Sequence, residues 1–141
     1  MIKKAIASYS KTKSLPSKSK QVSAEDRAYA MMRKHGFLIP VRNYKFDKER
    51  LWRFDFCWPT RFKIVPDVKG GTRRKVPVKV ALEIEGRGRH QTVSGYAKDC
   101  QKYNQAAIQG WLVVRVPTSA LSNEEWLVDV FDALRVRGGI E

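Results

Sequence analysis

The chain has 141 residues and a formal net charge of +14, with 28 Lys and Arg against 14 Asp and Glu. This length suits one domain with a core of its own, and the chain shows neither an apolar run of membrane-spanning length nor the apolar segment of a signal peptide. Cys57 and Cys100 stand far apart, which argues against a disulfide framework and a Cys/His zinc site and indicates reduced thiols in a cytoplasmic protein.

Most of the net positive charge comes from two segments, residues 1–22 and 61–79, each of which contributes +6. The first contains six lysines and no acid, which predicts a disordered basic arm ahead of a single domain at residues 23–141. Charge concentrated in this way favours a polyanionic partner, and nucleic acid is the commonest one. A structural RNA-binding role fits the charge equally well, and a solubilising tail explains the arm equally well. A membrane surface fits less well, because no basic amphipathic helix is evident.

A first helix is predicted over residues 23–36, because Ser23 and Asp26 have the spacing of a capping box. Its apolar stripe consists of Ala24, Ala28, Met31 and Met32. Glu25 lies in the first turn, where it complements the helix dipole.

Two strands are predicted next, over residues 37–44 and 51–58. Pro40 indicates that the first of them lies at an edge or a bulge. The second alternates with period two, so that one face is aromatic and consists of Trp52, Phe54, Phe56 and Trp58. Asp55 is the acid in the middle of the opposite face. We expect this strand to end at Trp58-Pro59.

Residues 59–79 predict a basic hairpin tip or loop, because Pro and Gly residues surround a cluster of cations. Its position beside the strand of Asp55 makes it a candidate clamp for a duplex backbone. A solvated loop is the alternative. The candidate DNA-binding side chains here are Arg61, Lys63, Lys69, Arg73, Arg74 and Lys75, and those of the turn after Gly86 are Arg87 and Arg89.

The segment over residues 80–86 alternates strictly and predicts a strand with two different faces. Its apolar face carries Val80, Leu82 and Ile84. Glu83 and Glu85 share the other face, where two carboxylates repel each other unless a positive charge lies between them. A half-exposed edge strand with solvated glutamates is the alternative for this segment alone. Pairing with the strand of Asp55 would bring three carboxylates together, which favours a divalent cation such as Mg²⁺, with Mn²⁺ as a substitute.

After a short basic turn that includes His90, a helix is predicted over residues 94–109. Its sheet-facing residues are expected to be Tyr96, Cys100, Tyr103 and Ala107. Asp99 and Lys102 share the adjacent flank, where an intrahelical pair is the simplest interpretation.

Residues 111–116 then predict a strand buried on both faces. A helix followed directly by such a strand implies a crossover and a mixed sheet. A last helix follows a second capping box at residues 122–125, with Trp126, Leu127, Val130, Phe131 and Leu134 facing inward.

These motifs resemble the PD-(D/E)XK nuclease superfamily, and most closely the small endonuclease-like proteins of phages and bacteria related to very-short-patch-repair endonucleases. The resemblance covers roughly residues 23–117. It rests on Arg53-Phe54-Asp55-Phe56, Ala81-Leu82-Glu83-Ile84-Glu85-Gly86, His90, Gly95-Tyr96, Asp99, Lys102-Tyr103-Asn104, Gly110-Trp111 and Arg115. Glu85 departs from the pattern, because the superfamily usually has a catalytic lysine at that position.

The resemblance implies a restriction-endonuclease-like α/β fold, with a mixed sheet flanked by helices in the order α-β-β-β-α-β-α. It also implies a Mg²⁺-dependent DNA endonuclease, acting on structured or branched DNA in recombination or repair. The implied metal ligands are Asp55, Glu83, the carbonyl of Ile84 and Glu25, and the further catalytic residues are Glu85, Lys102 and His90.

Four questions stay open at the level of sequence. A catalytically inactive nucleic-acid-binding module with the same fold is the alternative to an enzyme. A homodimer would be needed to make paired cuts in a DNA junction, but no self-complementary stripe indicates one. The alternative to a catalytic role for His90 is a side chain that is simply exposed. The alternative to a metal-ligand role for Glu25 is an interaction with the helix dipole.

Overall fold

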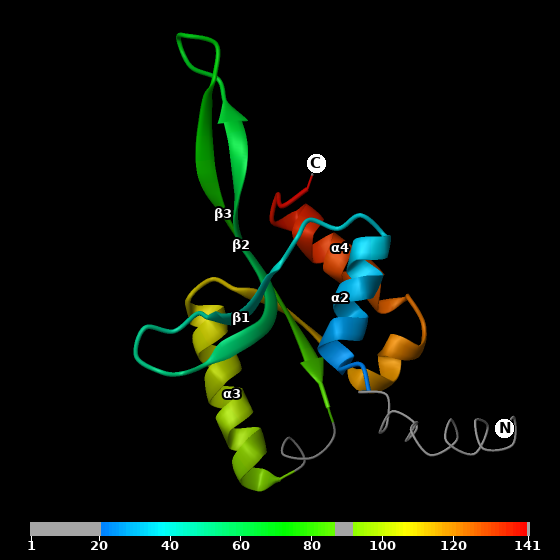
Figure 1. Cartoon of the computed structure of the whole chain (residues 1–141). Coiled ribbons are helices and arrows are strands. Elements are labelled where there is room, and N and C mark those ends of the chain that lie inside the picture. Colours follow the sequence, from blue (N-terminus) through cyan, green and yellow to red (C-terminus); the bar gives the residue numbers. More distant parts are fainter. Residues whose placement is uncertain (1–20, 87–91, 141) are drawn as a thin grey trace, which may run out of the picture.

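The computed structural model describes residues 21–86 and 92–140 and forms a four-stranded sheet with helices on both faces (Figure 1). The elements are α2 (Ala24–Lys34), β1 (Val41–Lys45), β2 (Arg53–Val65), β3 (Thr72–Glu85), α3 (Val93–Ile108), β4 (Leu112–Pro117), the 3-10 helix η2 (Thr118–Ser122) and α4 (Trp126–Val136). This mixed α/β sheet and the order α-β-β-β-α-β-α confirm the predicted fold class. No helix within the described residues is long and apolar enough to cross a membrane.

Of the disordered arm predicted at residues 1–22, only Gln21 and Val22 are described. The predicted basic turn at residues 87–90 also lies outside the described residues.

The strands lie side by side in the order β1-β2-β3-β4. The first three are antiparallel, whereas β3 and β4 are parallel and are joined through α3. A parallel pair needs such a crossover, because a tight turn cannot return the chain to the same end of the sheet. The predicted crossover is therefore confirmed. The expectation that residues 111–116 are buried on both faces is wrong, because β4 is an edge strand and Arg115 is exposed.

The helix α2 begins where the capping pattern predicts. The Ser23 hydroxyl accepts a hydrogen bond from the backbone N–H of Asp26 at 3.1 Å, which satisfies one of the free donors of the first turn. Ala28 and Met32 on its inner face are fully buried. The following strand is shorter than predicted and begins at Val41, directly after Pro40.

Two hydrophobic cores lie on opposite faces of the sheet. The first lies between the sheet and helices α2 and α4, and the second lies under α3. The alternation of Val80, Leu82 and Ile84 into the first core is confirmed. The expectation that Phe54 and Phe56 share a face is wrong, because Phe54 packs in the second core and Phe56 in the first.

The physical reason is an irregularity around Asp55. The β2–β3 ladder ends at the pair Phe56–Leu82, and opposite Asp55 in β1 the residue Asn43 has a positive φ of 51°. Both neighbours of β2 therefore depart from regular pleating at this point, and the strict period of two is lost.

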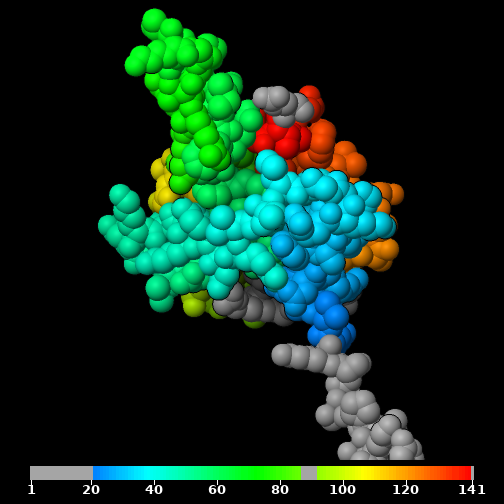
Figure 2. Space-filling model, turned by 45° about the horizontal axis from the view of Figure 1, so that its top comes forward, coloured from blue at the N-terminus to red at the C-terminus, as the bar shows by residue number. Residues whose placement is uncertain are grey.

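The β2–β3 hairpin is longer than predicted. The expectation that the strand ends at Trp58-Pro59 is wrong, because β2 continues to Val65. The ladder shifts register between Trp58 and Thr60, and Lys79 in the facing segment has a φ of 53°. A bulge of this kind accommodates Pro59, which has no N–H for the ladder. The distal part of the hairpin stands clear of the body (Figures 1 and 2).

The prediction for the inward flank of α3 is wrong in part, although Tyr103 faces the sheet as predicted and bonds Glu85 on β3. Gly95 and Ala106 are buried, whereas Tyr96 and Ala107 are exposed. Gly110 ends the helix with a φ of 85°, a conformation that glycine adopts without strain.

The last helix also departs from expectation at two points. The Ser122 hydroxyl donates to the carbonyl of Ser119 instead of capping α4. Phe131 is 47% exposed and meets Phe37 edge-on, while Ala133 takes a place in the buried stripe.

Candidate active site

Asp55 lies on β2 at the point where the β2–β3 ladder ends. Its Oδ2 accepts the backbone N–H of Ile84 at 2.8 Å, so the carboxylate takes the place of a ladder carbonyl. Burial raises the pKa of Asp55, and the Ile84 N–H opposes this rise. The charge of Glu25 adds to the rise in pKa, and the charge of Lys102 opposes it. The position therefore holds a carboxylate that is partly desolvated and only partly neutralised.

Glu83 lies on β3 and is only 7% exposed. Its Oε1 accepts a hydrogen bond from Nζ of Lys102 at 2.8 Å. Burial raises the pKa of Glu83 to about 7, and Lys102 counteracts this rise, whereas Asp55 and Glu85 add to it. A buried carboxylate needs a hydrogen-bonding partner. The inward flank of α3 supplies that partner, which explains why Lys102 faces the sheet.

Glu85 points to a different set of partners. Its Oε1 accepts hydrogen bonds from the Tyr103 hydroxyl at 3.0 Å and from Nε of Arg115 at 2.5 Å. The Arg115 guanidinium also lies over the Tyr103 ring, 4.1 Å from its centroid. Burial raises the pKa of Tyr103, and the charges of Glu83 and Glu85 add to this effect. Glu85 is therefore held by a cation from β4 and a phenol from α3.

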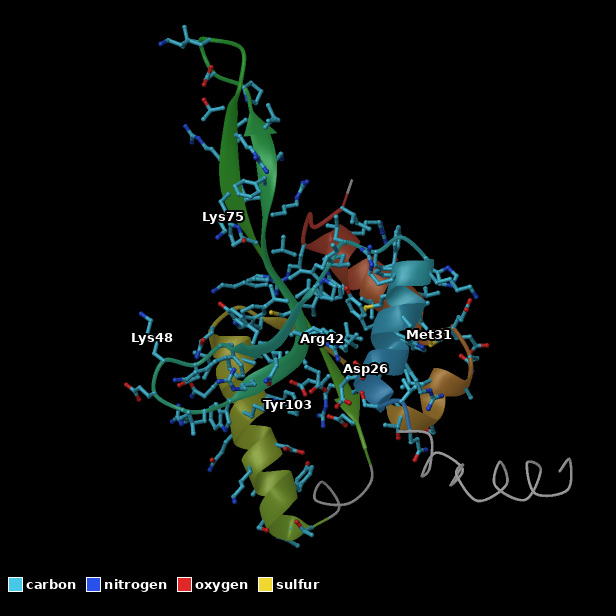
Figure 3. All side chains as sticks on the ribbon, in the orientation of Figure 1. Asp26, Met31, Arg42, Lys48, Lys75 and Tyr103 are labelled. Carbon is cyan, nitrogen blue, oxygen red and sulfur yellow. The ribbon has the colours of Figure 1, made fainter. Side chains whose placement is uncertain are left out.

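A pocket of about 530 Å³ opens in front of Asp55 and Glu83. It lies between the sheet, the first turn of α2 and the inner flank of α3, where Tyr103 is seen in Figure 3. Its lining consists of Glu25, Leu51, Trp52, Arg53, Asp55, Glu83, Ile84, Gly86, Gly95, Lys98, Asp99, Lys102 and Tyr103. Of the residues predicted to form the catalytic and metal set, Asp55, Glu83, Ile84, Glu25 and Lys102 line this pocket, and Glu85 does not.

A smaller pocket of about 260 Å³ shares Glu25 and Asp55 with the first. It also includes Arg42, whose guanidinium donates to Oδ1 of Asp26 at 2.7 Å (Figure 3). The two pockets together extend the concave surface from α3 to the N-terminus of α2.

The pair Asp55 and Glu83 fits a hard divalent cation. Among residues 21–86 and 92–140, no group of three or more His, Cys, Asp or Glu side chains is arranged to hold a metal ion. Mg²⁺, however, is usually bound by one or two carboxylates together with waters and substrate phosphates. The pKa values of Asp55 and Glu83 are both raised, so negative charge at this position lacks full compensation. The donor set therefore suits Mg²⁺ or Mn²⁺ with open coordination positions.

The predicted DNA-binding residues of the hairpin lie away from this pocket. Lys63, Lys69, Arg73, Arg74 and Lys75 are exposed on the projecting part, and Arg61 is half-buried nearer the body. Figure 3 labels Lys75 on this hairpin. The remaining candidates, Arg87, Arg89 and His90, lie outside the described residues.

Sequence reasoning named Arg115 only within the resemblance and placed Tyr103 only on the sheet-facing side of its helix, yet both side chains hold Glu85. It also assigned no role in the site to Trp52, Arg53 and Lys98, which line the pocket. The available signal was the helical spacing of Gly95, Lys98, Lys102 and Ala106, which places polar side chains next to two small residues on one flank.

Comparison with known proteins gives no match to a family model, a curated protein or a solved structure. The resemblance to PD-(D/E)XK nucleases stays a prediction based on the motifs themselves.

Proposed function

We propose that this protein is a metal-dependent DNA endonuclease that hydrolyses phosphodiester bonds. The observation that carries the proposal is the grouping of Asp55 from β2, Glu83 from β3 and Lys102 from α3 around one pocket. Two acids and a lysine are the residue types of the nuclease superfamily that the sequence resembles. Here the lysine comes from the helix, while the position that usually carries it holds Glu85.

Asp55 and Glu83 would hold Mg²⁺ or Mn²⁺, with the Ile84 carbonyl and Glu25 as further candidates. An ion held there would polarise the phosphodiester and lower the pKa of the attacking water. The Ile84 N–H orients the Asp55 carboxylate, because it fixes one of its two oxygens. Lys102 neutralises Glu83 in the metal-free protein and stabilises negative charge on the phosphate during the reaction. Glu85 assists as a ligand or base only after leaving Arg115.

A second candidate function is a catalytically inactive nucleic-acid-binding module. It is favoured by the ion pairs Lys102–Glu83 and Arg115–Glu85, which supply cations to both glutamates without a metal ion. The basic hairpin suits either function. The enzyme is preferred because Asp55 has no such ion pair among the described residues and stands beside Glu83 and Glu25 with a raised pKa.

The proposal includes DNA as the partner, structured or branched DNA as the substrate class, and a cytoplasmic location in a bacterial or phage-infected cell. The location is supported by Cys57, a buried free thiol whose pKa burial raises to about 12, and by Cys100, which is also free. No feature of the described residues favours a particular oligomeric state.

The test is cleavage of duplex, single-stranded and four-way-junction DNA with Mg²⁺, Mn²⁺ or EDTA. We expect cleavage of at least one substrate with either ion and none in EDTA. Asp55→Asn should abolish cleavage and retain DNA binding, whereas the control Asp132→Asn, an exposed acid on α4, should cut at the wild-type rate. Binding without metal-dependent cleavage of any substrate would establish the binding module instead.

A further inference from the structure

The distal β2–β3 hairpin, residues 60–77, is a two-stranded ribbon with an unusual distribution of charge. It contains six Lys and Arg residues against Asp67 alone. Asp67 lies at the turn, where its Oδ1 accepts the backbone N–H of Lys69 at 2.8 Å and its Oδ2 accepts the hydroxyl of Thr72. The one acid is therefore used to close the turn, and no ion pair joins a cation of the ribbon to an acid among residues 21–86 and 92–140.

The ladder register assigns these cations to both faces of the ribbon. Residues directly opposite in an antiparallel pair share a face. The pairs Phe62–Lys75 and Ile64–Arg73 therefore form one face, which we call face A. The Arg73 guanidinium lies 3.9 Å from the centroid of the Phe62 ring, which agrees with this assignment.

The pair Lys63–Arg74 lies on the opposite side, which we call face B. Each face thus presents two cations at exposed positions, and face B also carries Arg61, which is half-buried and pairs with Val76. Face A also exposes apolar side chains, since Phe62 is 55% and Ile64 is 63% exposed.

A partner that met only one side of the ribbon would need cations on that side alone. Exposed cations on both faces suit a partner that surrounds the ribbon with phosphates. The major groove of B-form DNA is about 12 Å wide and admits a two-stranded β-ribbon, whereas the minor groove is about 6 Å wide. Packed side-chain layers give a sheet a thickness of about 10 Å, which matches the wider groove.

We propose that the β2–β3 hairpin enters the major groove of duplex DNA, with face A and face B contacting the phosphates of opposite strands. The inference rests on the proposal that DNA is the partner of this protein. It adds the mode of contact, which the basic composition alone leaves undefined.

The same two strands carry the hairpin and the candidate active site. Phe62 follows Asp55 by seven residues along β2, which corresponds to about 23 Å of extended chain. At about 3.4 Å per base pair, the groove contact lies roughly seven base pairs from the bond that is cut.

The test compares two doubly substituted variants of the full chain that remove the same charge from opposite faces. These are Arg73→Gln with Lys75→Gln on face A, and Lys63→Gln with Arg74→Gln on face B. The control, Arg33→Gln with Arg135→Gln, removes the same charge from exposed positions on α2 and α4. Affinity for a duplex is measured by fluorescence anisotropy in EDTA over a series of salt concentrations.

The plot of log K against log salt has a negative slope, to which each phosphate contact contributes about 0.9. Both hairpin variants should therefore make this slope shallower by about 1.8. The control should keep the wild-type slope. A reduction in only one of the hairpin variants would mean that the ribbon lies flat on the backbone, and unchanged slopes in both would mean that it does not touch DNA. Either result overturns the groove contact.

Methylation interference identifies the groove. Methyl groups at guanine N7, which lies in the major groove, should weaken binding, and interference at adenine N3 alone would overturn the proposal. Because binding is measured in EDTA, its outcome is independent of cleavage. A wild type that binds as described but never cuts would refute the nuclease and leave the groove contact standing. A protein that cuts normally with an insensitive hairpin would refute the groove contact alone.

Discussion

Replacing Glu83 with Gln should remove a pH dependence of stability that the metal-free protein carries. Burial raises the pKa of Glu83 from 4.5 to about 7. The native state therefore binds more protons than the unfolded chain between these two values, so the free energy of unfolding falls as the pH rises through them. With about 1.4 kcal/mol for each tenfold change in proton affinity, this loss amounts to about 3 kcal/mol. The loss of stability is complete above about pH 8, and below about pH 4 there is none.

Gln is the suitable replacement because its Oε1 still accepts the hydrogen bond that Lys102 donates in the wild type. The assay is urea denaturation of both proteins in EDTA at intervals from pH 4.5 to pH 8. The wild type should lose about 3 kcal/mol more than Glu83→Gln over this range, and the exposed control Glu49→Gln should follow the wild type. Parallel pH profiles for wild type and Glu83→Gln would refute the reasoning that Glu83 is a strained, partly protonated acid.

Two further predictions concern the cations. Lys102→Ala, assayed with Mn²⁺, should cut roughly 100-fold more slowly at saturating DNA, because one stabiliser of transition-state charge is removed, while the dissociation constant stays nearly unchanged. The control Lys48→Ala, at an exposed lysine between β1 and β2, should keep the wild-type rate, and equal rates for both variants would return Lys102 to a purely structural role. Deleting residues 1–22, whose six lysines carry no acid, should leave the melting temperature unchanged and flatten the salt dependence of DNA binding by about 0.9 for each phosphate that this segment neutralises in the full chain. An unchanged slope would show that this segment does not touch DNA.

The parts of the fold that the sequence predicts depend on local patterns. The alternation in β3 assigns Val80, Leu82 and Ile84 to the core correctly, because neighbouring side chains in a strand point to opposite faces. The start of α2 follows from the Ser23 cap in the same way. The crossover from β3 to β4 also follows, since the chain order strand–helix–strand suits few connections.

The parts that were mispredicted depend on contacts between distant residues. Glu83 meets Lys102, 19 positions later, and Glu85 meets Arg115, 30 positions later. These pairs decide which flank of α3 faces the sheet, and helical periodicity alone favoured the more apolar flank of Tyr96. The length of the hairpin was missed because Pro59 suggests a strand end unless a bulge receives it.

The sequence therefore indicated some of the residues that line the pocket, but not its geometry. Asp55 and Glu83 do line one pocket. The orientation of Glu85 toward Arg115 depends on the register of β3 against β4, which pairs Glu83 with Arg115 and Glu85 with Pro117. No local signal specifies that register.

The central claim is that Asp55 and Glu83 form a metal site, and thermal melting tests it most directly. Wild type and Asp55→Asn are each melted in EDTA and in excess Mn²⁺. Asn retains an oxygen that accepts the Ile84 N–H, so the variant should fold in EDTA with a melting temperature equal to or slightly above that of the wild type. An ion that binds only the native state at 100 times its dissociation constant stabilises it by about 2.7 kcal/mol. Mn²⁺ should therefore raise the melting temperature of the wild type, and much less that of Asp55→Asn. Equal shifts in the two proteins, or none in the wild type, would contradict the metal site.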